Sequence, residues 1–169
     1  MKNNIDQEYS LIIKDIMENE TFNKMADIKH HNTTRLEHMY KVSYYSYLIA
    51  RLLHLNYKEV ARAGLLHDFY FGRTVDHDKI KDKIKLYTHN HPKEAVINAK
   101  KNFFINEMEE DIIKSHMFPI DIKIPKYAES WVVSTVDKVI GTHEFCKKAS
   151  KKLKYSMNLC LVLVLNILK

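Results

Sequence analysis

Ionisable residues that lie at helical spacing among apolar ones are the most informative feature of this sequence. Five residues share this placement: His38, His67, Asp68, His116 and Asp137. At such positions we expect the side chains to point into the protein. A buried carboxylate without partners costs on the order of several kcal/mol of folding free energy, and a buried imidazole needs hydrogen-bond partners for its ring nitrogens. A single inward histidine is more often a hydrogen-bonded core residue, but one divalent cation would explain all five as ligands.

Helices must position these residues, because the chain has only three glycines and three prolines and little strand-like alternation. The spacing predicts a helix ending near residue 19, a short helix over 22–28, a long helix to about 53, a helix from 56 or 57, and helices over 93–103, 106–117 and 127–146. The polar stretch 72–90 favours a loop or a poorly packed helix. We therefore expect an all-α fold, a single compact multi-helix bundle.

Local signals refine three of these helices. Thr34 and Glu37 fit a capping box at the start of the long helix. Pro92 suits the first turn of a helix whose N-cap is His91. On the long helix, the predicted inward stripe consists of His38, Val42, Tyr45, Ile49 and Leu52.

Length, charge and cysteine content limit the class of protein. A chain of 169 residues suits one domain with one core. The net charge of +6 favours anionic partners such as phosphorylated small molecules, nucleic acid or a membrane surface. Cys146 and Cys160 are too few for a disulfide framework or a thiolate zinc cluster, and the N-terminus has no apolar signal-peptide region. We expect a reduced, cytoplasmic compartment.

The C-terminal stretch 157–168 is almost continuously apolar and follows a run of lysines. As a helix it would span only ~18 Å, against the ~30 Å of a bilayer core. We therefore predict no transmembrane segment, but a packed helix over about 150–169 through which the chain could form a homodimer. A membrane-surface anchor is the alternative.

The order of the ionisable residues resembles the HD phosphohydrolase superfamily. The matching elements are His38, the stretch Ala63-Gly64-Leu65-Leu66-His67-Asp68, His91-Pro92, His116 and Asp137. The sequence is most similar to the two-metal branch and, within it, to an uncharacterised bacterial group. The resemblance implies one domain over 1–169, with N-terminal helices over 1–29 and the HD core over about 30–145.

The resemblance also implies a pair of metal sites. The first would consist of His38, His67, Asp68 and Asp137. Asp68 would bridge to a second divalent ion held by His91 and His116, because one carboxylate can offer an oxygen to each cation. Pro92 favours His91 as this ligand, although His89 stays an alternative. Iron, manganese, cobalt and magnesium are all candidate ions.

Two such ions would activate a water molecule as hydroxide and neutralise the phosphoryl oxygens. The resemblance thus predicts hydrolysis of a phosphate ester or anhydride, in a nucleotide or a related small phosphorylated metabolite, with Asp68 as the catalytic residue. Arg35, Lys93 and Lys138 are candidates for binding the phosphate, with plain surface roles equally open. Specific binding to nucleic acid is not expected.

One departure from the family pattern leaves the substrate open. Phe69-Tyr70-Phe71-Gly72 follows the His-Asp pair, where many members have Ile-Gly-Lys, and Arg73 is the nearest cation. The three aromatic residues could line a base-binding pocket, but they more often belong to a core. Two other functions also stay open, a di-iron oxygenase of the HD type and a non-catalytic nucleotide-binding module.

Overall fold

A computed structural model of the chain describes residues 2–30, 33–71 and 91–167, and most of them are helical. The elements in chain order are α1 (Lys2–Ile12), α2 (Lys14–Met17), α3 (Glu20–Asn23), the 3₁₀ helix η1 (Lys24–Asp27), β1 (Lys29–His30), β2 (Thr33–Thr34), α4 (Arg35–Leu52), α5 (Tyr57–Leu66), α7 (His91–Asn102), α8 (Glu107–Ser115) and α9 (Ala128–Ile167). The predicted all-α fold is confirmed.

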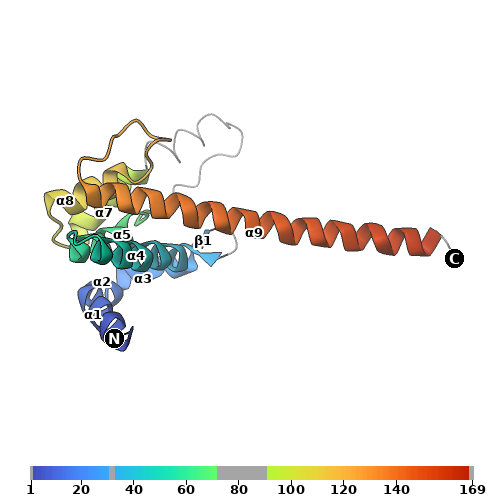
Figure 1. Cartoon of the computed structure of the whole chain (residues 1–169), viewed down its shortest axis with the longest axis horizontal. Helices are drawn as coiled ribbons and strands as arrows, with labels where there is room; N and C mark the ends of the chain where they lie inside the picture. Colours follow the sequence, from blue (N-terminus) through green and yellow to red (C-terminus); the bar gives the residue numbers. More distant parts are fainter. Residues whose placement is uncertain (1, 31–32, 72–90, 168–169) are drawn as a thin grey trace.

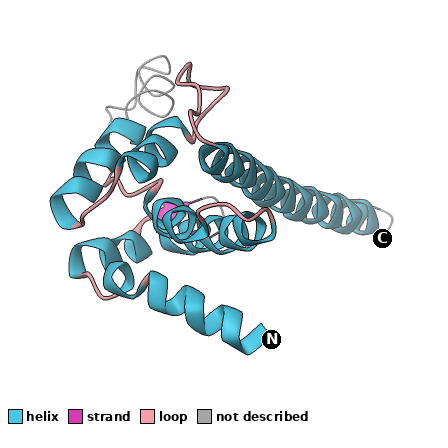
Figure 2. Cartoon of the chain, turned by 60° about the vertical axis from the view of Figure 1, so that its left-hand side comes forward, coloured by secondary structure: helices cyan, strands magenta, loops and turns pink. Residues whose placement is uncertain are grey.

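Helix α4 lies at the centre of the bundle. It packs against α5 and the first part of α9, while α8 contacts α5, α7 and α9. Figure 2 shows the same helices from another side, with the N-terminal helices below the rest of the bundle. The elements on which the predicted ligands lie are therefore connected, with α8 linking α7 to α5 and α9.

One apolar cluster holds these helices together. Tyr9, Ile16 and Phe22 bring the N-terminal helices into the same cluster as Leu65 and Ile112. Phe69 is fully buried in this cluster and packs edge-on against Phe22, so the first aromatic residue after His67-Asp68 belongs to the core.

The N-terminal segment is less regular than predicted. The single helix expected up to residue 19 is broken at Ile13 into α1 and α2, which lets Ile13 and Ile16 both enter the core. Asn19 caps α3 by accepting a hydrogen bond from Phe22 N at 2.9 Å, and the turn continues as the 3₁₀ helix η1. The two-residue strands β1 and β2, which pair antiparallel, are too short to leave an alternating pattern.

The predicted inward stripe of α4 is wrong beyond Val42. Tyr45, Ile49 and Leu52 are exposed, whereas Ser43 and Ser46 on the opposite side are fully buried. The reason is that α4 meets α5 through small polar residues, and Ser43 Oγ donates to Ala61 O at 2.6 Å. Because serine is a polar residue, a buried serine does not contribute to the apolar pattern of the sequence. The pattern therefore predicted the wrong buried face for α4.

Two further helix starts show side-chain caps. Thr34 Oγ1 accepts from Glu37 N at 3.2 Å, as the predicted capping box requires, while the Glu37 carboxylate pairs with Lys41 at 2.8 Å. Helix α8 has both bonds of a capping box, between Asn106 and Glu109. Helix α7 spans His91–Asn102, so His91, predicted as the N-cap, is already part of the helix.

Helix α9 is one continuous helix of 40 residues, not the two helices predicted over 127–146 and about 150–169. At 1.5 Å per residue it is about 60 Å long, and its second half extends beyond the bundle (Figure 1). None of the described helices is long and apolar enough to cross a membrane. The homodimer through the C-terminal stretch stays a prediction.

The close contact of α4 and α5 depends on Gly64. A Cβ atom at this position would lie 3.1 Å from Ser43 Cα, whereas one at Gly141 would meet no described atom within 4 Å. We expect Gly64→Ala to lower the free energy of unfolding by about 1–3 kcal/mol, because the buried backbone of α4 must shift. The matched control Gly141→Ala should raise it by up to ~1 kcal/mol through helix propensity. Thermal or urea unfolding of both variants measures this, and equal effects would contradict it.

Candidate metal centre

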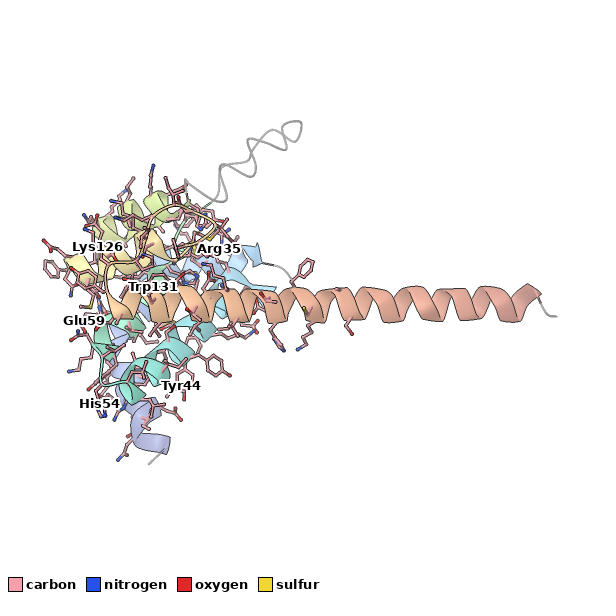
Figure 3. The ribbon with its side chains drawn as sticks, turned by 45° about the horizontal axis from the view of Figure 1, so that its top comes forward. Arg35, Tyr44, His54, Glu59, Lys126 and Trp131 are labelled. Atoms are coloured by element: carbon pink, nitrogen blue, oxygen red, sulfur yellow. The ribbon has the colours of Figure 1, made fainter. Side chains whose placement is uncertain are left out.

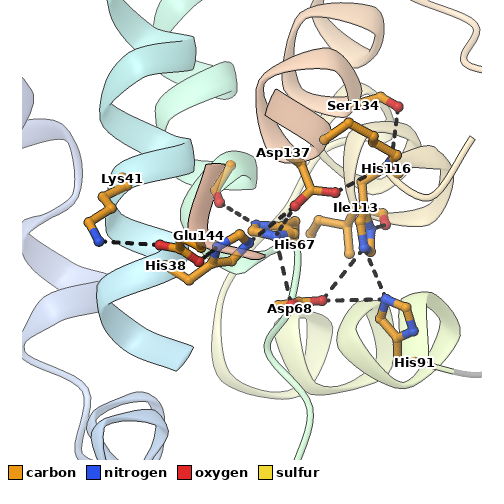
Figure 4. Close-up of polar contacts among 12 residues, drawn as sticks. His38, Lys41, His67, Asp68, His91, Ile113, His116, Ser134, Asp137 and Glu144 are labelled. Atoms are coloured by element: carbon orange, nitrogen blue, oxygen red, sulfur yellow. Dashed lines mark hydrogen bonds and ion pairs between the residues drawn. The ribbon is translucent and has the colours of Figure 1, made fainter. Parts of the chain in front are cut away.

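Six ionisable residues from five segments meet in the middle of the bundle (Figure 4). They are His38 on α4, His67 and Asp68 at the end of α5, His91 on α7, His116 at the end of α8 and Asp137 on α9. All except Asp137, which is partly buried, have less than a tenth of their surface exposed. The structure thus brings together all six predicted ligands.

His67 and His116 are held in the same way. Each is the C-cap of its helix, where backbone carbonyls lack helical partners. His67 Nδ1 donates to Gly64 O at 2.8 Å, and His116 Nδ1 donates to Ile113 O at 2.7 Å. Because a carbonyl can only accept, each ring carries its proton on Nδ1 and is free to present the Nε2 lone pair to the site.

A first cluster of ligand atoms surrounds Asp137. Its Oδ1 lies 3.1 Å from His38 Nε2 and 3.6 Å from His67 Nε2. Asp68 Oδ2 lies 3.9 Å from the same His67 atom. The Nε2 atom of His67 therefore lies beside oxygens of both carboxylates, and that of His38 lies beside Asp137.

A second cluster surrounds the other oxygen of Asp68. Oδ1 lies 3.4 Å from His91 Nε2 and 3.5 Å from His116 Nε2, and these two nitrogens are 3.0 Å apart. The Asp68 carboxylate thus stands between the two clusters with one oxygen toward each.

The residues fit a divalent metal ion. Among the described residues, no hydrogen bond reaches the buried atoms His67 Nε2 and Asp68 Oδ1. The ligand atoms of three overlapping groups lie within 4.8 Å of one another, and Asp68 belongs to two of these groups. Imidazole nitrogen and carboxylate oxygen are the donors that zinc, iron, manganese and cobalt accept in proteins.

The electrostatics of the site are those of two buried carboxylates among histidines. Burial would raise the pKa of Asp68, but the neighbouring rings of His67, His91 and His116 lower this pKa well below its usual value. Burial would also raise the pKa of Asp137, but the neighbouring rings of His38 and His67 lower it well below its usual value. A bound dication would stabilise both carboxylates while the imidazoles stay neutral.

His38 has a partner that the sequence analysis missed. Glu144 lies on α9 seven residues after Asp137, is 5% exposed, and its Oε2 is 3.1 Å from His38 Nδ1. Burial would lower the pKa of His38, but the hydrogen bond to Asp137 and the charges of Asp137, Asp68 and Glu144 raise it. The spacing of two helical turns from Asp137 is the signal that could have indicated Glu144.

The three predicted phosphate-binding cations lie in different surroundings. Lys138 donates to His116 O, pairs with Asp137 Oδ2 at 3.2 Å and borders the ligands. Arg35 is buried at the start of α4 (Figure 3), where it stacks on the Tyr70 ring at 3.8 Å and donates to Tyr70 O. Lys93 is exposed and borders a separate surface pocket.

A pocket of about 300 Å³ opens onto the ligands. Tyr70, Met117 and Ile120 add apolar surface to its wall beside the ionisable residues. This volume is at the small end of the range for small-molecule sites. The alternative ligand His89 and the predicted cation Arg73 lie outside the described residues.

Comparison with known proteins agrees with this geometry. The family model described as HD domain matches residues 35–164, which include all six ligand residues. Neither the curated proteins nor the solved structures contain a match. HD domains bind divalent metals and are generally metal-dependent hydrolases. Since the match covers well over half of the sequence, the chain belongs to the HD domain family.

Proposed function

We propose that this protein is a metal-dependent phosphohydrolase that cleaves a phosphate ester or anhydride in a nucleotide or another small phosphorylated metabolite. The observation that carries the proposal is the position of Asp68: its Oδ1 faces the Nε2 atoms of His91 and His116, and its Oδ2 lies on the side of His67. A carboxylate that binds a single cation does not require ligand atoms beside both of its oxygens.

Two sets of ligands share this carboxylate. We assign His38, His67, Asp68 and Asp137 to the first set, and Asp68, His91 and His116 to the second. Divalent cations held there would supply Lewis acidity toward phosphoryl oxygens and a water molecule acidified to near-neutral pKa. The protein's own part is to fix the rings, through the Nδ1 hydrogen bonds of His67 and His116, so that little reorganisation remains.

The remaining pocket wall suits a small anionic substrate. The ammonium group of Lys138 stands at the edge of the ligand cluster, where it could hold a phosphoryl oxygen. Tyr70, Met117 and Ile120 offer an apolar surface for the organic part of the molecule. Arg35, stacked on Tyr70, keeps that ring in place and adds positive charge behind it.

Metal removal is the first test. The purified protein is expected to contain divalent metal, with up to two ions per chain measured by elemental mass spectrometry. A chelator should abolish hydrolysis across a panel of phosphomonoesters, nucleotides and cyclic nucleotides, and manganese, iron, cobalt or magnesium should restore it. Oxygen uptake on addition of a substrate, in protein loaded with iron, would support the oxygenase alternative instead.

The second set of ligands is tested by His91→Ala. We expect metal content to fall from two ions to one and kcat to fall by about 100-fold or more, since one oxygen of Asp68 loses its cation. His143→Ala is the matched control, because His143 is exposed on α9 and does not border the pocket at the ligands. If His91→Ala keeps its full activity, the proposal of a second metal site is wrong.

Phosphate binding by Lys138 is tested by Lys138→Gln. A charge-assisted hydrogen bond contributes ~1.5–3 kcal/mol, so kcat/KM should fall by about 10- to 100-fold with metal content unchanged. Lys58→Gln, at an exposed position on α5, controls for the loss of one positive charge. A similar kcat/KM in both variants would exclude Lys138 from the substrate site.

A further inference from the structure

We propose that Glu144 is a positioning residue for the metal centre, which fixes the ring of His38 so that its Nε2 atom faces the ligand cluster. The inference rests on the metal-binding part of the proposed function, and it is independent of which reaction the bound metal serves. Its basis is a difference between His38 and the two other histidines whose Nδ1 contacts are known.

His67 and His116 need no help from another helix. Both are C-caps, and both donate from Nδ1 to a carbonyl three residues earlier in their own helix. Such carbonyls are available because the last turn of a helix leaves them without helical partners. Their ring orientation is therefore determined within a single segment.

His38 lies near the start of α4, inside the helix, where the carbonyls of the preceding turn accept hydrogen bonds from the helix itself. Its Nδ1 needs an acceptor from elsewhere in the fold. Glu144 on α9 supplies it, with Oε2 at 3.1 Å, and on the opposite side of the ring Nε2 lies 3.1 Å from Asp137 Oδ1 (Figure 4). One helix thus holds both sides of this imidazole.

The second oxygen of Glu144 is also fixed. Its Oε1 lies 3.2 Å from the ammonium group of Lys41, which pairs with Glu37 at 2.8 Å on its other side. Glu144 is 5% exposed, so its charge is costly without such partners. Lys41 and His38 are its hydrogen-bond partners among the described residues, and together they lock the carboxylate in one orientation.

Glu144 does not take part in the site directly. It belongs to none of the groups of potential ligands in the described chain, and it does not border the pocket that opens onto them. A carboxylate behind a metal-binding imidazole orients the ring, fixes the tautomer and makes the ligand more basic. Removing such a partner typically weakens metal binding by about 10- to 100-fold.

The test measures metal affinity in the absence of substrate, by competition of the full-length apo-protein with a chelator for cobalt(II). Glu144→Ala is expected to weaken binding of the ion at the His38 site by about 10- to 100-fold and to alter the visible absorption of the cobalt-loaded protein. Glu144→Gln, whose amide oxygen can still accept from Nδ1, should retain most of the affinity.

Glu129→Ala is the matched control. Glu129 lies on the same helix, is also 5% exposed and accepts two hydrogen bonds from Asn56, away from the ligands. It should lower the melting temperature of the apo-protein without changing cobalt affinity or spectrum. If Glu144→Ala behaves like Glu129→Ala, Glu144 has only a structural role and the inference is wrong.

A double-mutant cycle separates positioning from general stability. In a His38→Ala background, Glu144→Ala should cause no further loss of cobalt affinity, because the ring that Glu144 holds is absent. Additive losses would contradict the inference, and if Glu144→Ala does not fold, additive losses with Glu144→Gln would contradict it equally. If the wild-type protein binds no cobalt, both this inference and the proposed function fail.

Discussion

The burial of the Asp68 carboxylate is the constraint on which the rest of the structure depends. A buried carboxylate is stable only if positive or hydrogen-bonding partners surround it. Here imidazoles from three other positions, His67, His91 and His116, point at its two oxygens. The contacts of α8 with α5 and with α7 are thus the contacts that place these rings around one side chain.

The way α5 ends explains how two consecutive residues can serve one site. Neighbours within a helix point about 100° apart, but α5 ends at Leu66 and His67 is already its C-cap. Tyr70 N donates to Asp68 O at 2.8 Å, so the chain turns sharply here and Phe69 enters the core while Asp68 stays with the histidines. The His-Asp pair is therefore a feature of a helix end rather than of a helix face.

The sequence indicated the fold class and the six converging residues because both depend on local periodicity and on residue type. The face of α4 was predicted wrongly at Tyr45, Ile49 and Leu52, since buried serines replace apolar residues at the contact with α5. Glu144 was missed because its sequence neighbours His143 and Phe145 are exposed, and only the path of α9 past His38 makes it buried. In the sequence, the two-turn spacing from Asp137 is the signal of this contact, and spacing alone does not show that a glutamate is buried.

Helix α9 carries Asp137 and Glu144 seven residues apart, and both contact the same imidazole. Seven residues are close to two full turns, so the side chains point the same way. Inserting or deleting one residue between them would rotate Glu144 by about 100° away from His38. In evolution this short segment can therefore accept substitutions on its outer face, such as at Val139 and His143, while its length stays fixed.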